Sequence, residues 1–177
     1  MKDNIRKMVV SAMFLALGFV LPFFTAQLKE IGDTLLPMHI PVMLCGLICG
    51  WKYGLSVGIM LPFLRSVLVG MPPLYPNAVW MALEMGTYGM VIGLLYNKGT
   101  RKNQLWLYFS MLISMLSGRV VWGISKTILL GLKGSAFTLT AFLTGGFIDA
   151  LPGIVLQLLL IPVIMYLVDK FKVKDEI

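Results

Sequence analysis

Charged residues are scarce in this chain, and their scarcity sets its structural class. Only 13% of the 177 residues are Asp, Glu, Lys or Arg, whereas 58% are hydrophobic. A soluble domain carries about 25% charged residues, so the composition excludes that class. A membrane span needs about 20 mainly apolar residues, and six such spans with short loops fit this length. The sequence therefore predicts one all-α integral membrane domain, residues 1–177, with six transmembrane helices.

The residues and motifs that several chemistries require are also missing. The chain has one histidine and two cysteines, Cys45 and Cys49, which we interpret as small packing residues. It contains no Walker A loop and no HExxH motif. Together with the single histidine, these absences argue against ATP hydrolysis by this chain and against a metalloprotease or serine hydrolase site. We therefore expect a protein that is not an enzyme and that has no metal site and no cofactor.

Apolar runs separated by polar, glycine-rich or proline-rich connectors place the six helices. We expect a retained first helix, although the basic N-terminus followed by an apolar run is similar to a signal peptide. Pro41 interrupts the second helix, and Pro152-Gly153 kinks the last one. The expected ranges are 5–24, 36–49, 53–69, 77–96, 105–130 and 137–168.

The positive charges of the connectors predict the orientation. Ten Lys and Arg residues fall on the side of the two termini, and two fall on the other side. Cytoplasmic loops carry the excess of such residues, so both termini should be cytoplasmic. For the same reason we interpret the net charge of +7 as topology and contact with the lipid bilayer, and we expect no nucleic-acid partner. The ten are Lys2, Arg6, Lys7, Lys52, Lys98, Arg101, Lys102, Lys170, Lys172 and Lys174, and the two are Lys29 and Lys133.

Five ionisable residues lie inside the apolar runs, where a charge costs about 2.5–3.5 kcal/mol on insertion scales. Such residues face a protein interior or a watery cavity. The predicted orientation places all five in the outer half of the membrane, and three cations against two anions leave one excess positive charge. If they converge, they form a pocket that captures a small polar, anionic molecule from outside. The five are Arg65, Glu84, Arg119, Lys126 and Asp149.

Aromatic and polar residues accompany these charges. Arg119 and Lys126 are seven residues apart and share a helix face with Trp122, so we expect one of the two cations to meet the anionic group of the substrate. Arg65 is the next candidate. On the fourth helix, Glu84 lies close to one stripe with Asn77, Trp80 and Tyr88. The candidate substrate-binding residues are His39, Arg65, Asn77, Trp80, Glu84, Arg119, Trp122, Lys126 and Asp149.

A purely structural interpretation of the same residues stays open. Buried charges are usually paired, so Arg65–Glu84 and Arg119–Asp149 could tie helices together. Lys126 could extend to the outer headgroups. His39 could be a satisfied helix-end residue, and the tryptophans could be packing or interfacial residues.

The first helix carries small residues four apart, Ala12 and Ala16, in Ser11-Ala12-Met13-Phe14-Leu15-Ala16. This segment resembles the first helix of the substrate-binding S components of energy-coupling factor (ECF) vitamin transporters. The six short-looped helices of the chain and its lack of an ATPase motif agree with that resemblance. The resemblance implies that Ala12 and Ala16 dock a transmembrane coupling protein. It also implies two partner ATPases, a location in the plasma membrane of a prokaryote, and delivery of substrate by toppling of the subunit in the membrane.

Four segments look like the branch of that family assigned to pantothenate. They are residues 36–42, residues 46–54, Leu64-Arg65 together with Gly70-Met71-Pro72-Pro73, and residues 118–123. The alternative function is a standalone secondary transporter of a small anionic metabolite, coupled to protons or sodium. An ion relay needs polar groups through the full membrane thickness, whereas here they are confined to the outer half.

Overall fold

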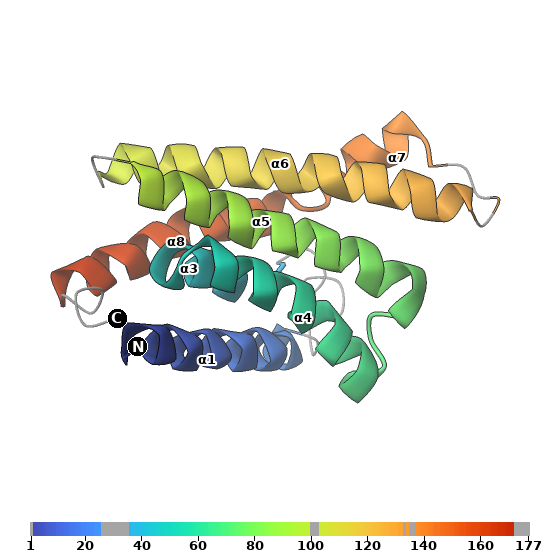
Figure 1. Cartoon of the computed structure of the whole chain (residues 1–177). Coiled ribbons are helices and arrows are strands. Elements are labelled where there is room, and N and C mark those ends of the chain that lie inside the picture. The colour runs from blue at the N-terminus through green and yellow to red at the C-terminus, as the bar shows by residue number, and fades with distance from the viewer. Residues whose placement is uncertain (1, 26–35, 100–102, 133, 135–136, 172–177) are drawn as a thin grey trace.

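The computed structural model describes residues 2–25, 36–99, 103–132, 134 and 137–171, and all the regular structure in these ranges is helical. The all-α prediction is therefore confirmed for this part of the chain. Two short π-helical turns, η1 (Leu74–Ala78) and η2 (Thr144–Ile148), precede α5 and α8 (Figure 1). The helices are α1 (Lys2–Thr25), α3 (His39–Cys49), α4 (Trp51–Val69), α5 (Val79–Lys98), α6 (Gln104–Gly131), α7 (Leu139–Leu143) and α8 (Leu151–Lys170).

Five helical segments of the described chain are long and apolar enough to cross a membrane. In hydrocarbon every backbone polar group must be satisfied internally, and a helix does this within one segment. The shorter α3 has 11 residues and rises about 16 Å, roughly half of a hydrocarbon core about 30 Å thick. Five of the six predicted spans thus correspond to candidate membrane-spanning helices, and the sixth stays a prediction. The five are Asp3–Phe24, Trp51–Val69, Leu74–Lys98, Gln104–Gly131 and Leu139–Lys170.

The short helix α3 is the centre of the bundle. Each of its residues is buried, and it packs against α1, α4, α5 and α8. We expected Pro41 to interrupt this helix, and that prediction is wrong. Pro41 lies in the first turn, where the backbone N–H that proline lacks would have no partner within the helix. Because other helices cover α3, its polar residues face protein and not lipid.

Glycines bring α4 and α5 into backbone contact. A Cβ atom added to Gly89 would overlap the carbonyl group of Gly54, and one added to Gly54 would overlap the carbonyl group of Gly89. Gly46 of α3 and Gly58 of α4 approach the α5 backbone in the same way. Small residues permit such close packing of membrane helices, which fixes how α5 is placed against its neighbours.

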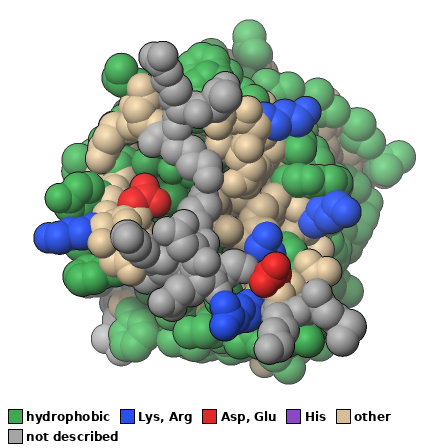
Figure 2. All heavy atoms as spheres, turned by 60° about the vertical axis from the view of Figure 1, so that its left-hand side comes forward, with side chains coloured by type: hydrophobic (Ala, Val, Ile, Leu, Met, Phe, Trp, Pro, Cys, Tyr) green, Lys and Arg blue, Asp and Glu red, His purple; other side chains and the backbone are tan. Residues whose placement is uncertain are grey.

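One end of the bundle collects both ends of the described chain. The start of α1 and the end of α8 lie there, on the left of Figure 1, and the Tyr53 hydroxyl donates to the Asn4 carbonyl at 3.3 Å. Figure 2 looks toward this end and shows Lys and Arg side chains around its rim. That this end faces the cytoplasm stays a prediction from the charge distribution.

The last apolar segment is broken as expected. Instead of one helix over 137–168, the chain forms α7, η2 and then α8, with the change of direction just before Pro152. Pro152 lies in the first turn of α8, a position that tolerates proline. The kink thus separates the short α7 from the 20 residues of α8, which pack on α6 and α3.

Candidate functional site

A buried carboxylate joins three helices in the interior of the bundle. Arg119 of α6 donates from Nη1 to Glu84 Oε1 at 2.8 Å, and the Tyr88 hydroxyl donates to the same oxygen at 3.3 Å. His39 of α3 places its Nε2 atom 3.7 Å from that oxygen. All four residues are 5% exposed or less. We call Glu84, Arg119, Tyr88 and His39 the polar cluster.

The antiparallel packing of α5 and α6 sets which residues meet in the polar cluster. The Ser114 hydroxyl donates to the Tyr88 carbonyl at 2.9 Å, and the Trp106 indole donates to the Leu95 carbonyl at 3.1 Å. Gly118 lets the Tyr88 ring approach the α6 backbone. These contacts fix the register that places Glu84 opposite Arg119.

The polar cluster has more hydrogen-bond donors than it uses. Arg119 Nε and Nη2 are buried and have no hydrogen-bond partner within the described chain. The two ring nitrogens of His39 are also buried and have no hydrogen-bond partner there. An unmade hydrogen bond to a buried group costs about 1–3 kcal/mol. Glu84 already accepts two hydrogen bonds, so the surplus groups are suited to the oxygen atoms of a small molecule.

Lys126 lies on the same face of α6 and is surrounded by aromatic rings. Its Nζ atom is 4.5 Å from the ring centroid of Trp122, 4.9 Å from that of Phe137 and 5.4 Å from that of Trp80. The Lys126 side chain is half-buried and has no ion pair with a carboxylate of the described chain. We call Trp80, Trp122 and Phe137 the aromatic cage.

Trp122 links the aromatic cage to the polar cluster. The Arg119 guanidinium lies 5.9 Å from the Trp122 ring centroid, and Lys126 lies over the same ring. The predicted shared face of Arg119, Trp122 and Lys126 is therefore confirmed. Cations over indole rings are stabilised by about 0.5–2 kcal/mol, more where water is excluded.

The other two intramembrane charges lie elsewhere. Arg65 of α4 donates to the Phe19 carbonyl of α1 at 3.2 Å and lies over the Phe23 ring, so it ties α4 to α1. Asp149 is exposed and forms no ion pair with a described residue. The pairings Arg65–Glu84 and Arg119–Asp149, which we considered as structural ties, are thus wrong. Arg119 pairs with Glu84 because α6 packs next to α5 and both helices are rotated so that these side chains face each other.

Of the remaining candidates, Trp80 is part of the aromatic cage, whereas the Asn77 side chain forms no hydrogen bond or ion pair with a described residue. Asn77 is half-buried in η1, one turn before Trp80. Ala12 and Ala16 are exposed on the outer face of α1, away from the helices on which α1 packs. Their accessibility is compatible with the predicted contact to another helix.

Two contributors were not among the predicted site residues. Tyr88 was noted on the stripe of Glu84 but given no role. Phe137 was expected only as the first residue of the last helix, whereas it precedes α7. The buried polar residue Gln157 of α8 was also overlooked. The rule that singled out the charges, that a polar group in an apolar span needs a partner, would have found it.

Open grooves of the described structure lie apart from the polar cluster. One groove of about 560 Å³ runs between α6 and α7, and another of about 290 Å³ runs between α5 and α6. Both are lined almost entirely by apolar side chains that face outward, as expected of surfaces in lipid. Within the described residues, no three His, Cys, Asp or Glu side chains are grouped as a metal site.

Comparisons with known proteins identify the family. The model of the ECF transporter, substrate-specific component family matches residues 6–165, which include the polar cluster, Lys126, three complete candidate membrane spans and most of the other two. Searches of curated proteins and of solved structures gave no match. The matched family supplies the substrate-binding subunit of a multi-pass membrane transporter. The chain belongs to the ECF transporter, substrate-specific component family.

Proposed function

We propose that this chain is the pantothenate-capturing subunit of an ECF transporter in the plasma membrane of a prokaryote. The observation that carries the proposal is the pairing of Arg119 with Glu84 beside Lys126, which has no carboxylate partner in the described chain. Two cations and one anion leave one positive charge in excess. That charge attracts an anionic substrate.

The polar cluster and the aromatic cage form two levels of the site, and two levels suit an elongated molecule. Arg119 and Lys126 are seven residues apart on one helix, which corresponds to a rise of about 10 Å. In our proposal the carboxylate of the substrate meets Lys126 and the aromatic cage. Its hydroxyl and amide oxygens meet the surplus donors of the polar cluster. Pantothenate has one carboxylate, two hydroxyls and an amide, and thus fits both levels.

The proposal includes the transport cycle that the family resemblance implies. The subunit binds pantothenate on the outer side, docks on the coupling protein through Ala12 and Ala16, and topples to release it inside. Two partner ATPases supply the energy. The exposed position of both alanines supports this docking face, and the gathering of Lys and Arg at one end of the bundle supports the required orientation.

Binding by the isolated subunit tests the assignment. We expect the purified protein to bind pantothenate in detergent without ATP and without a sodium or proton gradient, as measured by titration calorimetry. Native mass spectrometry of the purified protein should show pantothenate as a co-purified molecule. A different co-purified vitamin would reject the substrate but not the subunit class. Uptake by this chain alone that follows a proton or sodium gradient would favour the secondary transporter.

The role of Lys126 is tested by Lys126→Gln. We expect this variant to bind pantothenate about 1.5–3 kcal/mol more weakly, the usual contribution of a hydrogen bond to a charged group. The matched control is Lys52→Gln, because Lys52 also lies over a tryptophan, at 5.7 Å from Trp51, but at the basic end of the bundle. Calorimetry should show unchanged affinity for the control. Equal affinities for wild type, Lys126→Gln and Arg119→Gln would refute an anion site at this face.

The docking face is tested by Ala12→Trp and Ala16→Trp. Enlarging either residue should hold a partner helix away, while the distant polar cluster stays intact. We expect ATP-driven uptake by the assembled complex to fall at least tenfold and pantothenate binding by the isolated subunit to persist. The control is Leu159→Trp, which adds the same ring to an exposed position of α8. Normal uptake with both alanines enlarged would place docking elsewhere.

A further inference from the structure

Gln157 of α8 is a buried polar residue that the polar cluster does not include. The residue is 2% exposed, and its amide nitrogen has no hydrogen-bond partner in the described chain. Most buried polar groups in proteins are hydrogen-bonded, so an unpartnered buried amide calls for an explanation. Its position relative to the polar cluster supplies one.

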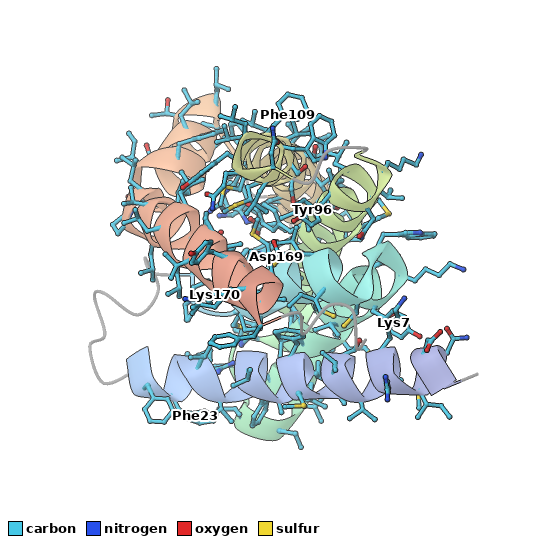
Figure 3. All side chains as sticks on the ribbon, turned by 90° about the vertical axis from the view of Figure 1, so that its left-hand side faces the viewer. Lys7, Phe23, Tyr96, Phe109, Asp169 and Lys170 are labelled. Atoms are coloured by element: carbon cyan, nitrogen blue, oxygen red, sulfur yellow. The ribbon has the colours of Figure 1, made fainter. Side chains whose placement is uncertain are left out.

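Gln157 lies at the same depth in the bundle as Glu84. Asp169 near the end of α8 is close enough to Tyr96 of α5 to interact electrostatically, and Figure 3 shows the two side by side. Both α5 and α8 run toward the end of the bundle where Tyr96 and Asp169 lie. Glu84 precedes Tyr96 by twelve residues, and Gln157 precedes Asp169 by twelve. At 1.5 Å per residue, both lie about 18 Å from the shared contact.

Gln157 also faces the right direction. It shares one stripe of α8 with Gly153, Ile161 and Met165, all buried and four residues apart. Ile161 and Met165 belong to the core that α3, α5 and α6 form. Of these helices, α8 packs directly on α6 and α3, which carry Arg119 and His39. The Gln157 amide is thus directed at the interior between those two helices.

We propose that Gln157 is a further substrate-contacting residue, which donates its amide N–H to an oxygen atom of the bound molecule. This inference rests on the proposed function. The groups left over at this depth are mostly donors: the Gln157 amide nitrogen and Arg119 Nε and Nη2. Such a set selects a molecule whose inner end carries hydroxyl or carbonyl oxygens, and it disfavours one that presents an amine there, because two donors cannot pair.

The test compares Gln157→Leu with wild type, with Gln104→Leu as the control because Gln104 is exposed at the start of α6. Pantothenate affinity is measured by calorimetry, and thermal unfolding is measured without ligand. We expect about 5- to 100-fold weaker binding for Gln157→Leu, since an oxygen of the ligand loses its donor. Unfolding of the ligand-free variant should occur at the same or a higher temperature, since no unpartnered amide remains. Gln104→Leu should match wild type.

Other outcomes overturn the proposal. Unchanged affinity with lower ligand-free stability means that Gln157 has a structural role only, and unchanged affinity with unchanged stability means that it has none. If Gln157→Leu fails to fold, Gln157→Glu, which keeps the shape but loses the amide N–H, is measured instead against the same two outcomes. If native mass spectrometry shows that wild type retains another molecule, pantothenate is wrong, and the affinities are compared for that molecule. If the wild-type protein binds no pantothenate and retains no other molecule, both proposals are overturned.

Discussion

Replacing Arg119 with methionine is expected to lower the free energy of unfolding by about 3–5 kcal/mol, because it leaves the buried Glu84 carboxylate without its cation. Pantothenate binding should also be lost, since the surplus donors of Arg119 disappear with its guanidinium. Stability is measured by unfolding in mixed micelles with increasing SDS. The control is Arg65→Met, because Arg65 is half-buried and donates to a backbone carbonyl, not to a carboxylate. It should cost about 1 kcal/mol.

The double variant Arg119→Met with Glu84→Gln separates charge from packing. A buried ion pair replaced as a whole is often neutral in stability, whereas removal of one partner is not. We expect the double variant to regain most of the lost stability but not to bind pantothenate. An equal loss of stability in the single and double variants would mean that the Arg119 side chain matters for packing and that its pairing with Glu84 does not.

Gly89→Ala is expected to destabilise the protein by about 3 kcal/mol, the upper range for overpacking. The added methyl group would overlap the carbonyl group of Gly54, and backbone cannot move aside as a flexible side chain can. The α4–α5 contact would have to open, and α5 carries Glu84 and Tyr88, so pantothenate affinity should fall as well. The same unfolding and binding measurements apply.

Gly131→Ala is the matched control for this substitution. Gly131 lies at the exposed end of α6, and a Cβ there meets no atom within 4 Å. We expect a change within about 0.5 kcal/mol and normal binding. If Gly89→Ala were as stable as Gly131→Ala, α4 and α5 could separate freely, and the glycines would not fix the position of Glu84.

Composition and hydropathy alone determined the class of this protein and most of its helices. A chain with so few charges must place its apolar runs in lipid, and there the backbone must be helical to satisfy its polar groups. The predicted range 77–96 compares with α5 at Val79–Lys98, and 105–130 compares with α6 at Gln104–Gly131. The cost of a charge in hydrocarbon likewise marked Arg119, Glu84 and Lys126 before any contact was known.

Only the tertiary structure decided which of these charges meet. Lipid is as apolar as a leucine side chain, so apolar residues cover both the buried and the exposed faces of a membrane helix. On α5, Leu83 is exposed and Met85 is buried, although leucine is the more hydrophobic of the two. Sequence periodicity therefore does not give the rotation of each helix or its neighbours. The close contact of Gly54 with Gly89 and the antiparallel register of α5 and α6 place Arg119 opposite Glu84, whereas Arg65 of α4 contacts α1. The packing of α8 on the bundle buries Gln157.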